Sequence, residues 1–227
     1  MNNIEIIKNE VTKILASDKS GHGMNHINRV ALTSTDFVKK ENANMELTLA
    51  IAYLHDVDDY KLVGLDNASN YTNTNMILSK TTFTEEEKTI ILNGVKTIGY
   101  SKRLEGIIPE SIEAKIVSDA DMLEAMGVIG ILRTYQYSIK NNRPLFDENI
   151  YPNLDMDAKT YKSKQSATAI NHVFEKLLRL KDLMLTESGK DIALKRHEYM
   201  IDFLREYFDE INNNEWNEYL TMYLKRK

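Results

Sequence analysis

Four ionisable residues of this chain stand where buried apolar side chains are expected. His26, His55 and Asp121 each fall on a mainly apolar helical stripe, and Asp56 follows His55 directly. A buried ionisable group is costly unless it is paired or bound to a metal ion. Two imidazoles and two carboxylates can together hold one divalent cation, which lowers the pKa of its water and polarises phosphoryl oxygens. These residue types therefore indicate a site for a divalent metal ion.

A lone histidine on an apolar face is more often a satisfied core residue than a ligand. The spacing of the four residues must therefore allow them to reach one ion. Adjacent residues on an α-helix point about 100° apart. His55 and Asp56 can still share one ion if that ion lies over the end of their helix. The polar segment 58–75 that follows the doublet is compatible with such an end.

Helices are the elements expected to position these side chains. The chain has only 9 Gly and 3 Pro, too few for a fold built on many tight turns. Apolar spacing predicts helices over 3–16, 26–37, 47–55, 84–98, 112–137, 163–186 and 193–211, with a short amphipathic tail around Trp216. We therefore predict an all-α protein, with residues 1–227 forming one domain.

Local signals mark where some helices begin, bend and end. Thr84 and Glu87 form a capping box that opens the helix over 84–98. The helix over 112–137 is expected to bend near Gly127 and Gly130, and the helix over 163–186 to stop near Gly189. Segments 58–75, 99–109 and 141–158 are expected to be loops or broken helix, and 141–158 to be a mobile loop.

Composition excludes several classes of protein. Hydrophobic residues make up 42% of the 227 residues, enough for a substantial core, and there is no cysteine for disulfides, thiolate zinc sites or nucleophilic catalysis. The net charge of −5 leaves no basic footprint for nucleic acid. The N-terminus is acidic, unlike a signal peptide, and no apolar run is long enough to span a membrane. We expect a soluble cytoplasmic protein.

The order of the four residues resembles the HD-domain metal-dependent phosphohydrolases. The likeness is closer to a bacterial branch related to an HD nucleotide pyrophosphohydrolase, and it covers roughly residues 18–211. The segments that carry it are His22-Gly-Met-Asn-His26-Ile-Asn-Arg29-Val30, Ala52-Tyr-Leu-His55-Asp56, Asp119-Ala-Asp121-Met-Leu-Glu-Ala-Met-Gly127 and Glu175-Lys-Leu-Leu-Arg-Leu-Lys181-Asp-Leu-Met184. The resemblance implies an HD-type helical bundle.

The resemblance implies that His26, His55, Asp56 and Asp121 are the metal ligands. Asp119 is the alternative last ligand, although two residues along a helix it would point roughly 200° away. One departure is Gly23, which stands where the branch usually has Asp. Any role outside the ligand set that this Asp normally fills is therefore not expected here.

The donor set and the histidine count indicate one ion. Two imidazoles and two carboxylates leave room for two waters in an octahedral shell, which suits Mn²⁺ first, with Fe²⁺, Co²⁺, Ni²⁺ or Mg²⁺ as alternatives. Binuclear HD phosphodiesterases resemble this family but use further histidines between the doublet and the last Asp. No histidine lies between Asp56 and Asp121.

Other residues are candidates for catalysis and substrate binding. Asp59 matches an acidic position that orients or deprotonates the attacking water in related mononuclear HD phosphatases, although it could be a plain helix-end acid. His22 is a candidate for a contact to a metal ligand or to the substrate, and otherwise a surface loop residue. The candidate phosphate-binding cations are Arg29, Lys61, Lys102, Arg133 and Lys181. Arg29 could pair with a carboxylate instead, and Lys181 could be a lysine at the rim of the core.

The resemblance favours hydrolysis of a nucleoside triphosphate to a monophosphate and pyrophosphate, with a small phosphorylated molecule as the partner of a monomer or homodimer. A nucleotide phosphomonoesterase and a non-enzymatic metal- or nucleotide-binding module are the alternatives. A guanosine-tetraphosphate hydrolase is disfavoured because Tyr60, rather than a second acid, follows Asp59. His172 and His197 are expected to be structural, and Tyr135 and Tyr137 to serve packing.

Overall fold

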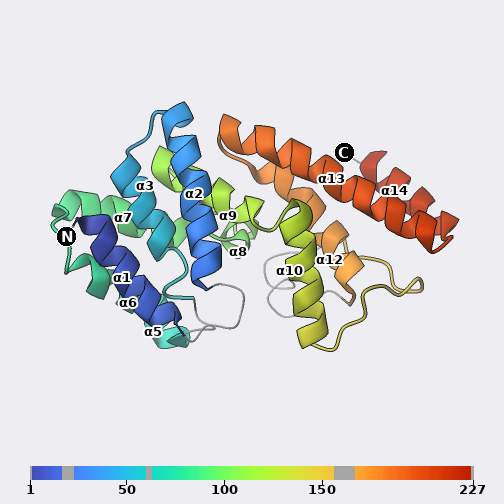
Figure 1. The fold of residues 1–227 in the computed structure, drawn as a ribbon, viewed down its shortest axis with the longest axis horizontal. Coiled ribbons are helices and arrows are strands. Elements are labelled where there is room, and N and C mark those ends of the chain that lie inside the picture. The colour runs from blue at the N-terminus through green and yellow to red at the C-terminus, as the bar shows by residue number, and fades with distance from the viewer. Residues whose placement is uncertain (1, 17–22, 60–62, 156–166, 226–227) are drawn as a thin grey trace. The chain divides into compact units, whose positions relative to one another are not determined.

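All regular elements that can be described are helices (Figure 1). The structure is a computed structural model and describes residues 2–16, 23–59, 63–155 and 167–225. Within these ranges there is no strand, which confirms the all-α prediction. Contacts divide the chain into two compact units, the first made of Met1–Glu124 with Met184–Gly189 and the second of the remainder.

The first unit is built around a helix that is apolar on all sides. Its helices are α1 (Asn3–Leu15), α2 (Met24–Glu41), α3 (Met45–Leu54), α5 (Leu65–Asn70), α6 (Thr72–Leu78), α7 (Glu85–Thr97), α8 (Tyr100–Leu104) and α9 (Ile112–Leu123). Residues 50–54 of α3 are all buried, and α3 contacts α1, α2, α7 and α9. An all-apolar helix must lie inside a core. The C-terminal end of α3, and with it the His-Asp doublet, is therefore placed among the other helices.

The second unit has an aromatic core. Its helices are α10 (Gly127–Lys140), α12 (Ala169–Glu175), the 3₁₀ helix η1 (Leu177–Leu183), α13 (Glu187–Glu210, of which 187–189 belong to the first unit) and α14 (Asn214–Lys225). Trp216, Phe174 and Phe208 are fully buried, and Tyr151 stacks on Trp216 with ring centroids 4.9 Å apart. Such pairs add to the apolar burial that holds the unit together.

Helix starts follow the capping signals. Thr84 Oγ1 accepts from the Glu87 backbone N–H and the Glu87 side chain accepts from the Thr84 N–H, which confirms the predicted capping box of α7. Asn2 and Glu5 form the same arrangement at α1. The described part of 58–75 holds the short helix α5 and the beginning of α6, in agreement with a broken helix.

Some predicted elements were wrong. The stretch 112–137 is not one bent helix, because α9 ends at Leu123 and α10 begins at Gly127, whose φ of 68° lies in the left-handed region that glycine adopts easily. The loop predicted over 99–109 contains the short helix α8. The stretch 163–186 is not one α-helix, because α12 ends at Glu175 and η1 follows it; residues 163–166 lie outside the described residues.

Gly189 does not stop a helix but lies inside the first turns of α13. A Cβ atom at this position would lie 2.3 Å from Oδ2 of Asp119. Glycine is thus needed here for close approach, which the sequence pattern does not distinguish from a stop signal.

The segment predicted to be irregular over 141–158 has no helix in its described part, residues 141–155. It is nevertheless bonded to its surroundings, since Asn153 N–H donates to Glu175 at 2.8 Å and Trp216 Nε1 donates to the Glu148 carbonyl at 3.1 Å. Its mobility stays a prediction.

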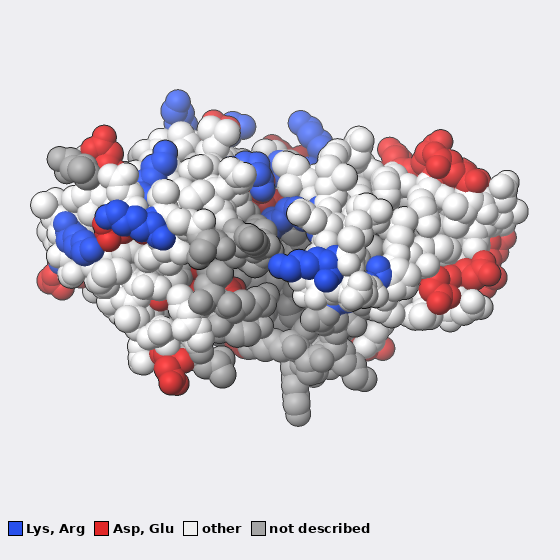
Figure 2. Space-filling view, turned by 60° about the horizontal axis from the view of Figure 1, so that its bottom comes forward, with Lys and Arg blue, Asp and Glu red and all other residues white. Residues whose placement is uncertain are grey.

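The distribution of surface charge and the hydropathy of the helices are relevant to the predictions about nucleic acid and membranes. On the face seen in Figure 2, the described Lys and Arg side chains lie in separate groups rather than over one continuous area. Within the described ranges, no helix has both the length and the apolar composition that a membrane crossing requires.

Candidate metal centre

Three helices of the first unit carry the four predicted ligands. His26 lies in the first turn of α2, and Asp121 lies in the last turn of α9. His55 is the C-cap of α3, and Asp56 follows it. The doublet therefore lies over a helix end, which is the geometry in which neighbouring residues can face one ion.

The structure brings the four side chains together. His26 Nε2 lies 3.4 Å from His55 Nε2, 3.6 Å from Asp56 Oδ2 and 3.4 Å from Asp121 Oδ1. His55 Nε2 lies 3.5 Å from Asp56 Oδ2 and 3.8 Å from Asp121 Oδ1. Neighbouring ligands of an octahedral ion lie about 3 Å apart when the bonds are about 2.1 Å long. The two Nε2 atoms and the Asp56 carboxylate thus form a group of donor atoms within 4.8 Å of one another that could hold a cation, and Asp121 lies beside both imidazoles.

Both imidazoles are oriented by contacts at their other ring nitrogen. His55 Nδ1 lies 2.8 Å from the Ala52 carbonyl oxygen, so Nδ1 carries the hydrogen and Nε2 presents its lone pair. His26 Nδ1 lies 3.7 Å from Glu124 Oε2. A cation among the two Nε2 atoms and two carboxylates satisfies all four donors at once, and the donor set fits a divalent ion with octahedral preference.

The charge of the cluster also suits a cation. With both imidazoles neutral, Asp56, Asp121 and Glu124 carry three negative charges and Arg29 carries one positive charge, which leaves an excess of two negative charges. Burial opposes a charge on His26, yet hydrogen bonding to Asp121 and Glu124 outweighs burial and raises the pKa of His26 to about 9. Burial likewise opposes charge on Asp121 and Glu124, but their contacts with His26 lower the pKa of both carboxyls.

Glu124 is the residue of this cluster that the sequence interpretation missed. Its side chain is buried, and it accepts from Arg29 Nε at 2.6 Å. The alternative reading of Arg29, as the partner of a carboxylate, is thus realised in the structure. A usable signal was present, since Arg29 stands three residues after His26 and Glu124 three after Asp121, so both fall on the helix faces that carry the ligands.

Asp119, the alternative last ligand, has a different environment. Its carboxylate accepts from the Leu185 N–H, the Thr186 N–H and the Thr186 hydroxyl, and it is fully buried. Burial raises the pKa of Asp119 against these hydrogen bonds. Asp119 therefore fastens the segment Met184–Gly189 to α9, and we do not assign it to the metal cluster.

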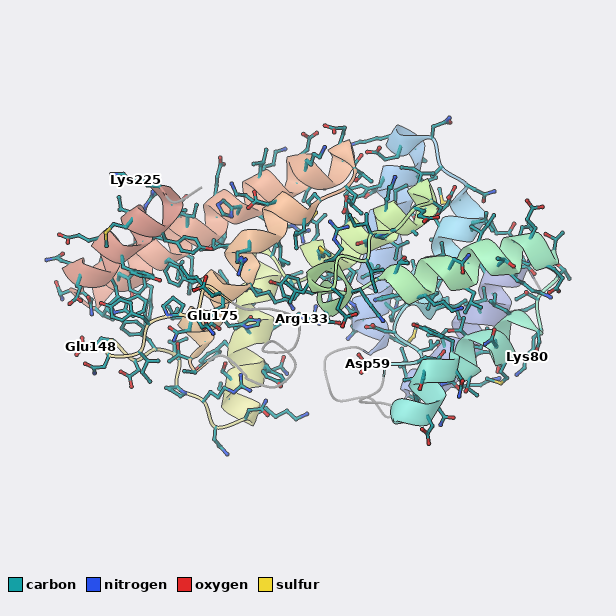
Figure 3. The ribbon with its side chains drawn as sticks, turned by 180° about the vertical axis from the view of Figure 1, so that it is seen from behind. Asp59, Lys80, Arg133, Glu148, Glu175 and Lys225 are labelled. Atoms are coloured by element: carbon teal, nitrogen blue, oxygen red, sulfur yellow. The ribbon has the colours of Figure 1, made fainter. Side chains whose placement is uncertain are left out.

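The remaining predicted residues lie in different places. Asp59, labelled in Figure 3, is half-buried and ends a turn in which its N–H donates to the Asp56 carbonyl at 3.1 Å. Arg133 and Lys181 belong to the second unit. His22 and Lys61 lie outside the described residues. The roles of all these residues stay predictions.

Two further histidines and two tyrosines were expected to be structural. His197 is buried in α13. Burial and the charges of Lys176 and Arg143 lower the pKa of His172 to about 3, so this imidazole is neutral. Tyr135 and Tyr137 are exposed, with 45% and 44% of their surface accessible, and the guanidinium of Arg143 lies over the Tyr137 ring at 5.1 Å from its centroid.

Comparison with known proteins identifies the class. Residues 23–126 match the family model of the HD domain, and this range contains all four residues of the cluster. The chain therefore belongs to the HD-domain superfamily of hydrolases and has its all-helical fold.

Within this superfamily the chain belongs to a bacterial family typified by YpgQ. It is 30% identical to YpgQ of Bacillus subtilis over 226 residues, covering 91% of this chain and 93% of YpgQ. A crystal structure of YpgQ in complex with ADP matches with a TM-score of 0.70 over 92% of this chain and 94% of that one.

Two other solved structures are similar. A Lactobacillus plantarum protein is 34% identical, with a TM-score of 0.80 over 92% and 97% of the two chains. An HD-superfamily hydrolase of Bacillus thuringiensis is 33% identical, with a TM-score of 0.73 over 92% and 96%.

Proposed function

We propose that this protein is a metal-dependent phosphohydrolase that cleaves nucleoside triphosphates to monophosphates and pyrophosphate. The observation that carries the proposal is that the Nε2 atoms of His26 and His55 lie 3.4 Å apart and that a carboxylate oxygen of Asp56 and one of Asp121 each lie 3.4–3.8 Å from both of them. Membership of a hydrolase superfamily supports the reaction class. The complex of YpgQ with ADP supports a nucleotide as the substrate.

Residues of this chain would hold the metal ion and activate the attacking water. His26, His55, Asp56 and Asp121 would hold one divalent ion, with Mn²⁺ preferred and Fe²⁺, Co²⁺, Ni²⁺ or Mg²⁺ as alternatives. When bound, this ion polarises a phosphoryl oxygen and acidifies water. Asp59 would orient the attacking water and accept its proton as the new P–O bond forms at the α-phosphorus. The bond to the β-phosphate breaks, and pyrophosphate leaves with the electron pair.

The test is a panel of nucleoside tri-, di- and monophosphates incubated with protein and Mn²⁺, assayed for phosphate with and without added inorganic pyrophosphatase. We expect phosphate from triphosphates only when pyrophosphatase is present. Asp56→Ala should remove both hydrolysis and metal, measured by elemental analysis, while the helical circular dichroism persists. Glu86→Gln, an exposed change on α7, is the control and should behave like wild type.

Each other outcome contradicts a defined part of the proposal. Phosphate released directly from monophosphates would replace it with a phosphomonoesterase. No release from any nucleotide by metal-loaded protein would favour a binding module. Full activity and metal content in Asp56→Ala would refute the metal site.

A further inference from the structure

Glu124 and Arg29 join the two helices that carry the first and last residues of the metal cluster. Arg29 lies one turn after His26 on α2, and Glu124 lies one turn after Asp121 as the C-cap of α9. Arg29 Nε donates to Glu124 Oε2 at 2.6 Å, and the same oxygen lies 3.7 Å from His26 Nδ1. The pair thus meets the imidazole of His26 on the side away from the cluster.

We propose that Glu124 is a positioning residue that holds the His26 imidazole with its Nε2 lone pair toward the metal, and that Arg29 holds Glu124 rather than contacting substrate. This inference rests on the metal site of the proposed function. The sequence offered Arg29 as a phosphate-binding cation or as the partner of a carboxylate, and it gave Glu124 no role.

The two histidines of the cluster differ in how they are held. The Nδ1 atom of His55 faces a backbone carbonyl at 2.8 Å, a contact that no side-chain substitution removes directly. His26 faces a carboxylate, which attracts the Nδ1 hydrogen more strongly than a carbonyl does and increases the basicity of Nε2. The orientation of His26 therefore depends on a side chain that can be changed.

Arg29 is needed because Glu124 is buried. The side chain of Glu124 is only 4% exposed, whereas that of Arg29 is 39% exposed. A buried carboxylate without a cationic partner would be costly and would seek another conformation or a proton. The guanidinium neutralises Glu124 in place, so that its oxygen remains directed at His26.

The experiment measures Mn²⁺ affinity directly, by electron paramagnetic resonance of free Mn²⁺ in titrations of metal-stripped protein. We expect Glu124→Gln and Arg29→Gln each to weaken Mn²⁺ binding about 10- to 100-fold, the usual effect of losing a group that orients a metal-binding histidine. Their effects should not add in the double variant, because both act through one contact. Glu124→Asp, which keeps the charge, should retain more affinity than Glu124→Gln.

Glu175→Gln is the matched control. Glu175 is as buried as Glu124 but lies in the second unit, where it accepts from the Asn153 N–H. It should bind Mn²⁺ like wild type. At saturating Mn²⁺, the KM of Arg29→Gln for nucleoside triphosphate should stay within about twofold of wild type, since Arg29 is not a phosphate contact.

Unchanged Mn²⁺ affinity in Glu124→Gln would overturn the inference. A raised KM in Arg29→Gln with unchanged Mn²⁺ affinity would overturn it too, and would make Arg29 a substrate contact. Wild-type protein that binds no Mn²⁺ would refute the metal site and this inference together. Wild-type protein that binds Mn²⁺ but hydrolyses no nucleotide would refute only the proposed function.

Discussion

At the scale of single residues, the cluster shows why side-chain type is informative when it conflicts with its surroundings. His26 and His55 stand among buried apolar neighbours, and such positions tolerate ionisable groups only when something pairs with them. The structure supplies that pairing through the two imidazoles, Asp56 and Asp121. Asp59 is different, because its half-buried position at the end of a turn is ordinary for an acid.

A substitution separates chemistry from binding at Asp59. If it orients and deprotonates the attacking water, Asp59→Asn should lower kcat about 10²- to 10⁴-fold, the usual contribution of a positioned general base. Mn²⁺ affinity and KM should change little, because Asp59 would contact water rather than the ion or the substrate. Steady-state kinetics on metal-loaded protein measures this.

The control for that measurement is Asp66→Asn, which removes an exposed acid in the first turn of α5 and should leave kcat unchanged. If Asp59→Asn turns over like wild type, Asp59 is a helix-end acid and the proton goes elsewhere.

The four clustered residues could be predicted from sequence because pattern and order agree. Glu124 was not singled out, because a lone acid near a helix end is usually solvated, although its spacing from Asp121 equals that of Arg29 from His26. Only the packing of α2 against α9 shows that it meets Arg29 and His26.

At the scale of elements, helices with clear caps were predictable, and helices defined by tertiary contacts were not. The capping box of α7 is a local signal and holds in the structure. The leucine-rich stretch of η1 fits an α-helical stripe equally well, because three buried residues in a seven-residue segment do not distinguish 3.0 from 3.6 residues per turn. Gly189 was interpreted as a helix stop signal. Its contact with Asp119, seventy residues earlier in the chain, cannot be recognised from the neighbouring sequence.

That close approach gives a stability prediction. Gly189→Ala places a Cβ 2.3 Å from Asp119 Oδ2 and 2.9 Å from Asp119 Cβ, so the buried carboxylate and its bonds to Leu185 and Thr186 must shift. Overpacking of this kind costs about 1–3 kcal/mol, more than the gain of up to about 1 kcal/mol from replacing glycine in a helix. Urea denaturation should show a lower midpoint with an unchanged slope.

Glu198→Ala, at an exposed position of the same helix, isolates the helix-propensity effect and should not lower the midpoint. Equal or greater stability of Gly189→Ala would mean that Asp119 does not fasten Met184–Gly189 to α9.

At the scale of the whole molecule, the metal cluster couples the stability of the fold to metal binding and to the protonation of His26. The cluster joins α2, α3 and α9 in the core of the first unit, so whatever occupies it stabilises the contacts among these helices. A proton on His26 and a metal ion both neutralise the excess negative charge, and they compete because Nε2 has one lone pair. The ratio between the two occupants must therefore change with pH.

The sign of that change follows from the raised pKa of His26. A histidine whose pKa rises from 6.5 to about 9 on folding stabilises the metal-free protein fully below about pH 6.5, and this contribution is lost as pH rises through about 9. Metal-free protein should thus become less stable over this window. Acidic contributions of Asp121 and Glu124, whose pKa values are lowered, change only at lower pH. Mn²⁺ must displace the His26 proton, so its apparent affinity should rise about tenfold per pH unit below the pKa.

Thermal unfolding with a fixed excess of Mn²⁺ and with a chelator, at several values from about pH 6.5 to 8.5, measures this linkage. The difference between the two Tm values should widen as pH rises, because stabilisation by a ligand grows with the logarithm of its concentration relative to its Kd. Subtracting the Tm values with chelator from those with Mn²⁺ removes the effect of groups that titrate in the same way with and without the metal. A Tm difference that stays constant or narrows would show that no proton leaves when Mn²⁺ binds, and His26 would then already be neutral in the metal-free protein, contrary to its raised pKa.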